Sequence, residues 1–302
     1  MNQVAHRNRI SDPHFVHVGV GNGFNVFPVF SHLAFSEALS PWLMFDYAAP
    51  KHFEPTRQRL GVGQHPHRGF ETITIAFQGG VEHADSVGNT DVIGPGDVQW
   101  MTAGRGIIHE EYHSTEFAKT GGTFEMCQLW LNLPKKHKMT APNYQPILAK
   151  SIPEVRVEAE GEAECGANPA TVRIIAGEFR GTVGPAKTFS PVELWDVSIP
   201  QPDKPIVLTL PEGHTGIVFV RRGAIDIGAE SAGDRVGPQG VALLEGAGSN
   251  VRVVAKEEGT QLLLLGGEPL NEPIAAQGPF VMNTRKEIME ANMDFQEGRM
   301  GR

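Results

Sequence analysis

Short apolar stretches alternate with turn residues along most of this 302-residue chain. Glycine (35) and proline (22) are abundant, and they separate apolar segments such as residues 241–244 and 262–265. Segments of this length between turn signals predict β-strands rather than the longer amphipathic helices of a bundle. We therefore expect an all-β fold built from β-barrels, and the chain is long enough for two domains of ordinary size.

The pattern occurs twice. Gly80 and residues 93–95 have counterparts in Gly223 and residues 236–238, each 143 positions later. In both copies a strand ends at the glycine, a hairpin follows, and a Gly-Pro turn starts another apolar strand. This repeat predicts tandem barrels. The expected boundaries are 1–140 for the first barrel, 141–170 for a linker, 171–284 for the second barrel, and 285–302 for a C-terminal helix and tail.

The C-terminal segment has the signature of a helix start. Thr284 and Glu287 have the spacing of a capping box, and Ile288, Met289 and Phe295 follow. We expect an amphipathic helix that docks its apolar face on a barrel. A helix that binds a partner protein is the alternative.

Four residues in the first copy have the spacing of metal ligands on strands. His65 and His67 are two residues apart, as are His109 and Glu111. Alternate side chains of a strand point to the same face, so each pair shares a face, and Glu110 points away. If both pairs face one point, three imidazoles and a carboxylate form a site with nitrogen and oxygen ligands and no sulfur.

Two further residues have matching parity. His113 lies one strand step beyond Glu111, where we expect a packed residue or one at the pocket rim. Glu71 is in phase with the histidine pair, which makes it a candidate fifth ligand or a neighbour that orients a ligand.

The second copy lacks this constellation. At the offset of 143, the four positions become Leu208, Leu210, Arg252 and Val254. Eleven of the twelve histidines lie at or before His137, and only His214 follows. A shift of one or two residues therefore does not restore three imidazoles. We expect the second barrel to be apolar inside and metal-free, to brace the first barrel and to shape one wall of its pocket.

Several longer motifs resemble the pirin family of the cupin superfamily. They occur in order along the chain, at residues 65–72, 99–111, 128–133, 267–270 and 278–284. The resemblance implies two cupin (jelly-roll-like) β-barrels and a single iron in the N-terminal barrel, held by the residues matching His65, His67, His109 and Glu111. It also implies an activity like that of quercetin 2,3-dioxygenases or a role as a redox-sensitive transcriptional coregulator. The stretch 48–64 is longer and more polar than the family pattern, so we expect a reshaped pocket mouth.

Four protein ligands leave two positions of an octahedral shell open, as a metal needs to hold a substrate and dioxygen together. We expect one Fe(II) per chain, while Mn, Co, Ni, Cu and Zn are other divalent metals that an N/O site binds in vitro. The expected substrate is a small aromatic or enolic compound such as a flavonol, with Glu111 as general base.

Two other functions fit the same residues. One is an iron-bearing regulatory protein that binds a protein partner and responds to the oxidation state of the iron. The other is a metal-dependent cupin isomerase, in which His113 or Tyr112 supplies an extra acid or base.

Composition and charge bear on the binding partners and the cellular location of the protein. The net charge of −9 argues against direct binding of nucleic acid, because binding phosphates requires Lys and Arg. Cys127 and Cys165 form no recognisable disulfide framework, which favours a reducing compartment. Residues 1–11 contain no apolar core of a signal peptide, and no segment approaches the length of a membrane span. We expect a cytoplasmic monomer that does not bind membranes.

Overall fold

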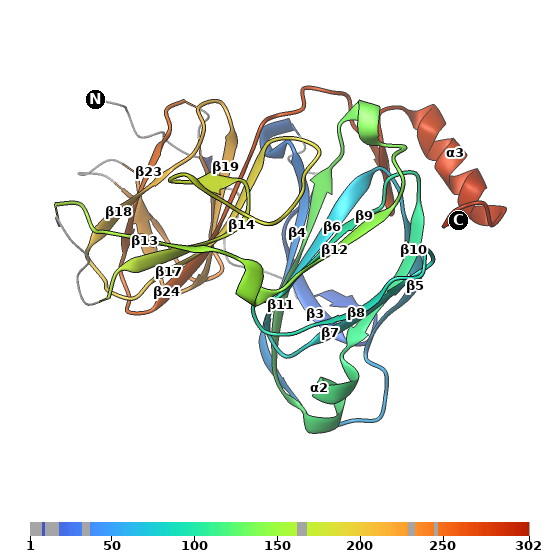
Figure 1. The fold of residues 1–302 in the computed structure, drawn as a ribbon, viewed down its shortest axis with the longest axis horizontal. Helices are drawn as coiled ribbons and strands as arrows, with labels where there is room; N and C mark the ends of the chain where they lie inside the picture. Colours follow the sequence, from blue (N-terminus) through green and yellow to red (C-terminus); the bar gives the residue numbers. More distant parts are fainter. Residues whose placement is uncertain are drawn as a thin grey trace. The chain divides into compact units, whose positions relative to one another are not determined.

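The computed structural model describes residues 8–9, 18–31, 37–161, 168–228, 233–244 and 247–301 (Figure 1). Most of residues 1–11, the N-terminal segment in which we expect no signal peptide, lies outside the described residues. Cys165 lies outside them too. The chain forms two compact units. The N-terminal barrel unit contains Phe15–Glu37, Pro41–Ala149 and Leu270–Arg302. The C-terminal barrel unit contains Met1–His14, Ala38–Ser40 and Lys150–Pro269.

Two antiparallel sheets form the barrel of the N-terminal barrel unit, as the strand pattern predicts. The larger sheet has the order β12-β9-β6-β11-β4-β3-β2 and the smaller one β5-β10-β7-β8. The strands of the larger sheet, in chain order, are β2 (Val18–Val20), β3 (Phe24–Ser31), β4 (Trp42–Phe53), β6 (Phe70–Gln78), β9 (Val98–Thr102), β11 (Gly122–Asn132) and β12 (Asn143–Ile147). Those of the smaller sheet are β5 (Gly61–His67), β7 (Val81–Asp85), β8 (Thr90–Ile93) and β10 (Ile107–His113).

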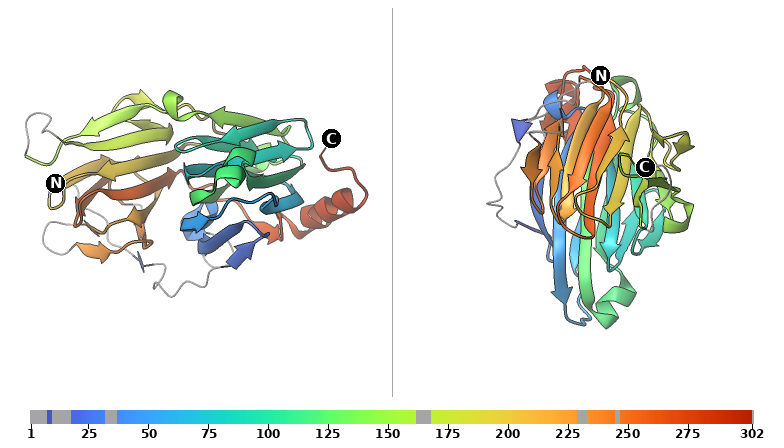
Figure 2. Two further views of the ribbon diagram at one scale, coloured as in Figure 1. Left: turned by 90° about the horizontal axis from the view of Figure 1, so that it is seen from below. Right: turned by 90° about the vertical axis from the view of Figure 1, so that its left-hand side faces the viewer.

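One end of this barrel is filled with apolar side chains. The short helix α2 (Thr115–Thr120) lies at this end, beside the far ends of β4 and β11 (Figures 1 and 2). Its Phe117 packs in a buried cluster with Phe24, Val26 and Phe124, among others. The polar interior positions of the barrel are therefore concentrated away from α2, where β5 ends and β10 begins.

The C-terminal barrel unit repeats the same strand orders. Its larger sheet runs β1-β22-β19-β24-β17-β14-β13 and its smaller sheet β18-β23-β20-β21. The larger sheet contains β1 (Asn8–Arg9), β13 (Glu154–Val157), β14 (Ala170–Ala176), β17 (Val192–Ile199), β19 (Thr215–Arg222), β22 (Val241–Leu244) and β24 (Thr260–Gly267). The smaller contains β18 (Pro205–Thr209), β20 (Ile225–Ile227), β21 (Asp234–Val236) and β23 (Asn250–Ala255). The predicted all-β fold with two tandem barrels is confirmed.

The interior of the second barrel is lined with apolar side chains, as the sequence predicts. Val251, Val253 and Ala255 of β23 are buried in its core, and Leu208 of β18 lies opposite Val251. Arg252, the residue aligned with His109, instead forms an ion pair with Glu160. The two copies of the repeat are therefore out of register by one residue on β23. Among the described residues, no histidine occupies an interior position of this barrel.

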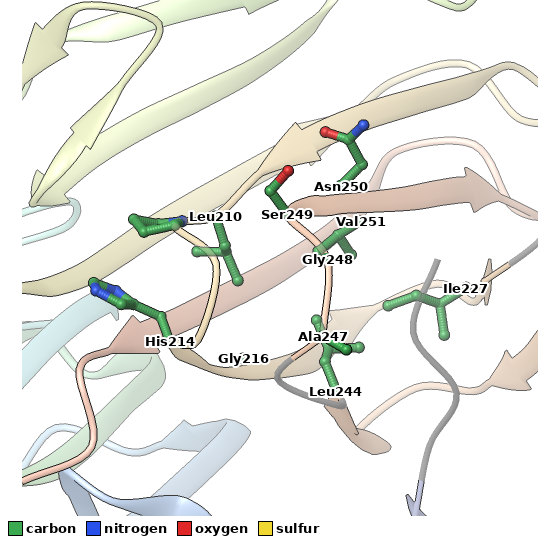
Figure 3. Close-up of a pocket in the computed structure, with 11 residues that line it drawn as sticks. Leu210, His214, Gly216, Ile227, Leu244, Ala247, Gly248, Ser249, Asn250 and Val251 are labelled. Atoms are coloured by element: carbon green, nitrogen blue, oxygen red, sulfur yellow. The ribbon is translucent and has the colours of Figure 1, made fainter. Parts of the chain in front are cut away.

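A small pocket opens at the corresponding end of the second barrel (Figure 3). Leu210, Leu244 and Val251 line it together with His214, whose Nδ1 lies 2.9 Å from Glu193 Oε2. The cavity measures about 20 Å³, which is enough for roughly one water molecule. This histidine is held by a carboxylate at the edge of an apolar space.

The C-terminal segment packs on the N-terminal barrel. It forms β25 (Ala275–Gln277), β26 (Phe280–Met282) and α3 (Arg285–Gln296). The predicted boundaries place residues 270–284 in the second barrel, whereas the structure groups them with the first. The apolar side chain of Val281 explains this grouping, because it packs against Phe70 and Trp130.

The predicted capping box is present at the start of α3. Thr284 Oγ1 accepts a hydrogen bond from the Glu287 amide, and Glu287 Oε2 accepts one from the Asn283 amide. The expected apolar face is only partly correct. Ile288 is buried against the β25–β26 hairpin, whereas Met289 is 60% exposed and Phe295 41% exposed.

Candidate metal centre

Strands β5 and β10 bring three imidazoles together. The two strands pair in antiparallel register, with His109 opposite His65 and Ile107 opposite His67. Ring centroids lie 4.3 Å apart for His65 and His109, and 4.9 Å apart for His67 and His109. The three rings each offer a nitrogen, and these atoms lie within 4.8 Å of one another. The structure thus brings together the three histidines that strand alternation singles out in the sequence.

The burial of β10 follows the same alternation. Ile107, His109, Glu111 and His113 are buried, and the residues between them are more exposed. Glu110 is one of these intervening residues, and its carboxylate lies 3.7 Å from Arg59 Nη2. Of the two adjacent glutamates, Glu111 is therefore the one on the interior face.

The hydrogen bonds of the three rings leave nitrogen lone pairs without a partner. Nδ1 of His65 lies 2.9 Å from the Gly63 carbonyl, and Nδ1 of His67 lies 3.4 Å from the Pro279 carbonyl. A carbonyl only accepts, so each Nδ1 carries the hydrogen and each Nε2 has a free lone pair. The buried His67 Nε2 and both nitrogens of His109 have no hydrogen-bond partner among the described residues.

Buried polar atoms without partners are costly, and a metal ion bound by one lone pair from each ring would satisfy His67 Nε2 and one nitrogen of His109. Burial and the neighbouring rings also lower the pKa of His67 to about 3 and hold the pKa of His109 well below its ordinary value. Both rings are consequently neutral at pH 7, which is the form that binds metals. The cluster fits a divalent cation.

The carboxylate of Glu111 lies beside this cluster and is held by three donors. Oε1 accepts hydrogen bonds from Thr74 Oγ1 at 3.1 Å and from Gln99 Nε2 at 2.9 Å. Oε2 accepts one from Gln128 Nε2 at 2.8 Å. Glu111 groups with His109 and His83 in a second cluster of potential ligands, which shares His109 with the first.

His83 is a site residue that sequence reasoning missed. It lies on β7 opposite Glu111, and its side chain is fully buried. Nε2 lies 3.2 Å from Asp85 Oδ2, and Nδ1 lies 3.3 Å from Gln99 Nε2. Both nitrogens are thus engaged, so His83 is a hydrogen-bonded neighbour rather than a free ligand. The spacing of His83 and Asp85, two residues apart on one strand, was the available signal in the sequence for a site residue here. The sequence shows no third residue that would complete a site with this pair.

Glu71 does not join either ligand cluster. Strand β6 begins only after a turn at Gly69, whose φ is +89°, so the alternation that starts at His65 does not continue to Glu71. Its carboxylate instead accepts a 2.7 Å hydrogen bond from Thr102 Oγ1. Burial raises the pKa of Glu71 to about 7. The expectation of a fifth ligand is therefore not supported by the geometry.

The remaining candidates have structural roles. His113 is buried among Phe24, Phe53 and Phe124, and its Nε2 lies 3.0 Å from the Gly23 carbonyl. It is a packed residue, one of the two roles expected for it. The side chain of Tyr112 lies under the Arg59 guanidinium at 3.8 Å, on the opposite face of β10.

The histidine cluster is covered on one side by aromatic residues and by the C-terminal hairpin. The rings of Phe70 and Trp130 lie 5.1 and 5.2 Å from His67. Arg68, next to His67, is buried and pairs with Asp294 of α3 at 2.8 Å. This ion pair lies within the N-terminal barrel unit.

Comparison with known proteins identifies the family. The sequence matches the Pirin family over residues 23–131 and the pirin C-terminal cupin domain over residues 194–301. The chain belongs to the pirin family. It is 49% identical over 281 residues to a Pseudomonas aeruginosa protein named "Putative quercetin 2,3-dioxygenase", and the match covers 93% of each chain. Human pirin is 36% identical over 265 residues, which are 87% of this chain and 83% of the human one.

Solved pirin-like structures share the architecture. A crystal structure titled as a quercetin 2,3-dioxygenase from Acinetobacter baumannii has a TM-score of 0.89 and 46% identity, and the match covers 99% of this chain and 98% of that one. The predicted pirin membership and double cupin fold are thereby confirmed. Among the described residues, no helix is both long and apolar enough to span a membrane.

Proposed function

We propose that this pirin-family chain is a metal-dependent dioxygenase that opens the ring of an aromatic or enolic compound. Quercetin-type flavonols are the first substrates to test. One divalent metal, iron(II) in our proposal, would be held by His65, His67, His109 and Glu111. The observation that carries the proposal is the set of buried imidazole nitrogens that lack hydrogen-bond partners among the described residues, next to an oriented carboxylate. The names of the similar bacterial proteins support it.

The charge of the ligand set suits this chemistry. Three neutral imidazoles and one carboxylate offset only one charge of a divalent cation, which leaves a net positive site for an anionic oxygen of the substrate. When bound, the iron supplies the redox chemistry by which dioxygen reacts with a deprotonated enol or phenol. Both oxygen atoms enter the organic product, so the substrate itself is the reductant.

The protein side chains supply proton transfer and exclusion of water. Glu111 accepts the hydroxyl proton of the substrate at a carboxylate oxygen, and the donors Thr74, Gln99 and Gln128 hold that carboxylate in place. Phe70 and Trp130 shield one side of the histidine cluster with apolar surface. Such shielding strengthens electrostatic interactions inside the site.

The test is dioxygen uptake by protein loaded with Fe(II) in the absence of air and then mixed with a flavonol and oxygen. The proposal predicts uptake coupled to loss of the flavonol in the wild type. The His109→Ala variant should lose it, whereas His52→Ala at an exposed position should retain it. No uptake above the His109→Ala control, with iron bound, contradicts the dioxygenase and favours the iron-bearing regulator that binds a protein partner.

A further inference from the structure

A chain of hydrogen bonds links Glu111 to the turn between β7 and β8. Asp85 begins the chain, because its Oδ1 accepts hydrogen bonds from the amides of Val87 and Asn89, both at 3.0 Å. Oδ2 of Asp85 faces His83 Nε2 at 3.2 Å. A turn with two backbone bonds to one carboxylate oxygen fixes where the other oxygen points.

The position of Asp85 fixes the tautomer of His83. A carboxylate only accepts, so Nε2 of His83 carries the hydrogen and Nδ1 has the lone pair. Nδ1 then accepts a hydrogen bond from Gln99 Nε2 at 3.3 Å. Tyr144 holds the plane of the imidazole, since its ring stacks on His83 at 4.8 Å and its hydroxyl donates to Asp91.

Both hydrogens of the Gln99 amide nitrogen are engaged. One goes to His83 Nδ1 and the other to Glu111 Oε1 at 2.9 Å, while Oε1 of Gln99 lies 3.4 Å from the Tyr144 hydroxyl oxygen, whose hydrogen goes to Asp91. The side chain of Gln99 is fully buried. The opposite orientation of the amide would place its carbonyl oxygen against the Glu111 carboxylate. The hydrogen bonds that run from Asp85 through His83 and Gln99 to Glu111, here called the relay, therefore select one orientation.

We propose that Asp85, His83 and Gln99 are positioning residues that fix the carboxylate of Glu111 beside the histidine cluster. The inference rests on the proposed function, because it takes Glu111 as a metal ligand and proton acceptor. The tautomer of His83 sets the orientation of the Gln99 amide, which donates to Glu111 Oε1. Without this donor the carboxylate keeps only its bonds from Thr74 and Gln128, and its contact with the metal and with the substrate proton changes.

The first test is Gln99→Met, which keeps the volume and removes both hydrogen bonds. We expect kcat to fall about tenfold to a hundredfold with KM within about twofold, as for other residues that orient a metal ligand. The visible absorption of protein loaded with Co(II) should shift, while one equivalent of Co(II) still binds. Gln78→Met is the control for the loss of a glutamine–glutamate hydrogen bond, because the exposed Gln78 donates through Nε2 to Glu125 Oε2 elsewhere in the same barrel. It should leave the spectrum and kcat unchanged.

Asp85→Asn provides a second variant if Gln99→Met fails to fold. The backbone amides of Val87 and Asn89 can only donate, so they require the carbonyl oxygen of the new side chain. Its NH₂ group would then face His83 and the side-chain amide of Asn89, which can change tautomer and orientation respectively. Nε2 of His83 would then have to accept, and Nδ1 would carry the hydrogen and lose its bond from Gln99. The same spectral shift and the same loss of kcat are expected without a change of volume.

A wild-type Co(II) spectrum and wild-type kcat in the relay variants would overturn the inference. Equal losses in Gln99→Met and Gln78→Met would also overturn it, since they indicate general destabilisation. If the wild type consumes no flavonol, the proposed dioxygenase activity fails, but the Co(II) spectra still decide whether the relay positions Glu111.

Discussion

At the scale of single residues, hydrogen bonding separates the histidines of this barrel by role. Among the described residues, His67 and His109 have buried nitrogens without partners, whereas His83 is engaged at both nitrogens and His113 binds a carbonyl within an aromatic cluster. The sequence identifies the candidate ligands His65, His67 and His109, because their alternation is local. It does not identify His83 as their neighbour, because the partner Gln99 comes from another strand.

The Glu111→Gln variant separates binding from catalysis. The amide keeps the shape of the side chain but is a much weaker base than the carboxylate, so we expect kcat to fall about a hundredfold or more. At least about half of the iron should remain bound, because the three imidazoles proposed as ligands are unchanged. Steady-state kinetics together with metal analysis of the same samples measure both quantities.

The neighbouring Glu110→Gln variant is the control for this experiment. Glu110 lies on the other face of β10, near Arg59, so its replacement should leave turnover and iron content unchanged. If turnover of Glu111→Gln falls only in proportion to lost iron, Glu111 is a ligand and not the general base.

At the scale of elements, alternation is reliable only within a continuous strand. It places Glu111 inward and Glu110 outward on β10, and the structure agrees. It fails for Glu71, because the Gly69 turn separates β5 from β6 and resets which face each residue occupies. The position of the C-terminal hairpin also escapes prediction, since its contacts join residues more than a hundred positions apart.

Lys138 anchors this hairpin to the barrel. Its buried Nζ donates to the Gly69 carbonyl, to Asn132 Oδ1 and to the Val281 carbonyl at 2.7–2.9 Å. Lys138→Met leaves these three acceptors without their donor, so we expect the free energy of unfolding to fall by about 3 kcal/mol. Chemical denaturation measures this loss. The exposed Lys136→Met control should change it by less than about 0.5 kcal/mol.

The same lysine predicts a dependence of stability on pH. Burial lowers the pKa of Lys138 to about 7 in the folded state, whereas an unfolded lysine has a pKa of about 10.4. Between these values the unfolded state binds more protons, so the contribution of Lys138 to stability rises with pH and levels off above about pH 10. Denaturation of the wild type and Lys138→Met at pH 7 and pH 9 measures the difference. A difference that is constant or shrinks with rising pH contradicts the lowered pKa.

At the scale of the whole molecule, the repeat predicts the two barrels because turn spacing and strand rhythm are shared by both copies. The offset of 143 fits the Gly-Pro turns but not every interior position, since β23 is shifted by one residue against the first copy. The unshifted alignment places Arg252 at the interior position of His109, whereas the shifted one places Val251 and Val253 inside. The division of the chain is less predictable, because Leu270–Arg302 returns to the N-terminal barrel unit.

This architecture predicts one metal ion per chain. Anaerobic titration of metal-free protein with iron(II), followed by metal analysis, should saturate at one equivalent. His214→Ala in the second barrel should bind the same amount, because His214 is paired with Glu193 in the second barrel's pocket. The His67→Ala variant should lose most of the iron. Two equivalents in the wild type, or loss of iron in His214→Ala, would show that the assigned site is incomplete.

The fate of labelled dioxygen decides whether the chain is a dioxygenase. Protein loaded with iron(II) is supplied with a flavonol under ¹⁸O₂, and the organic products are analysed by mass spectrometry. The account predicts that both labelled atoms of one dioxygen molecule enter the products of each flavonol consumed, and that His109→Ala forms none. Flavonol loss without the label, or equal product formation by His109→Ala, would contradict a dioxygenase at this histidine cluster.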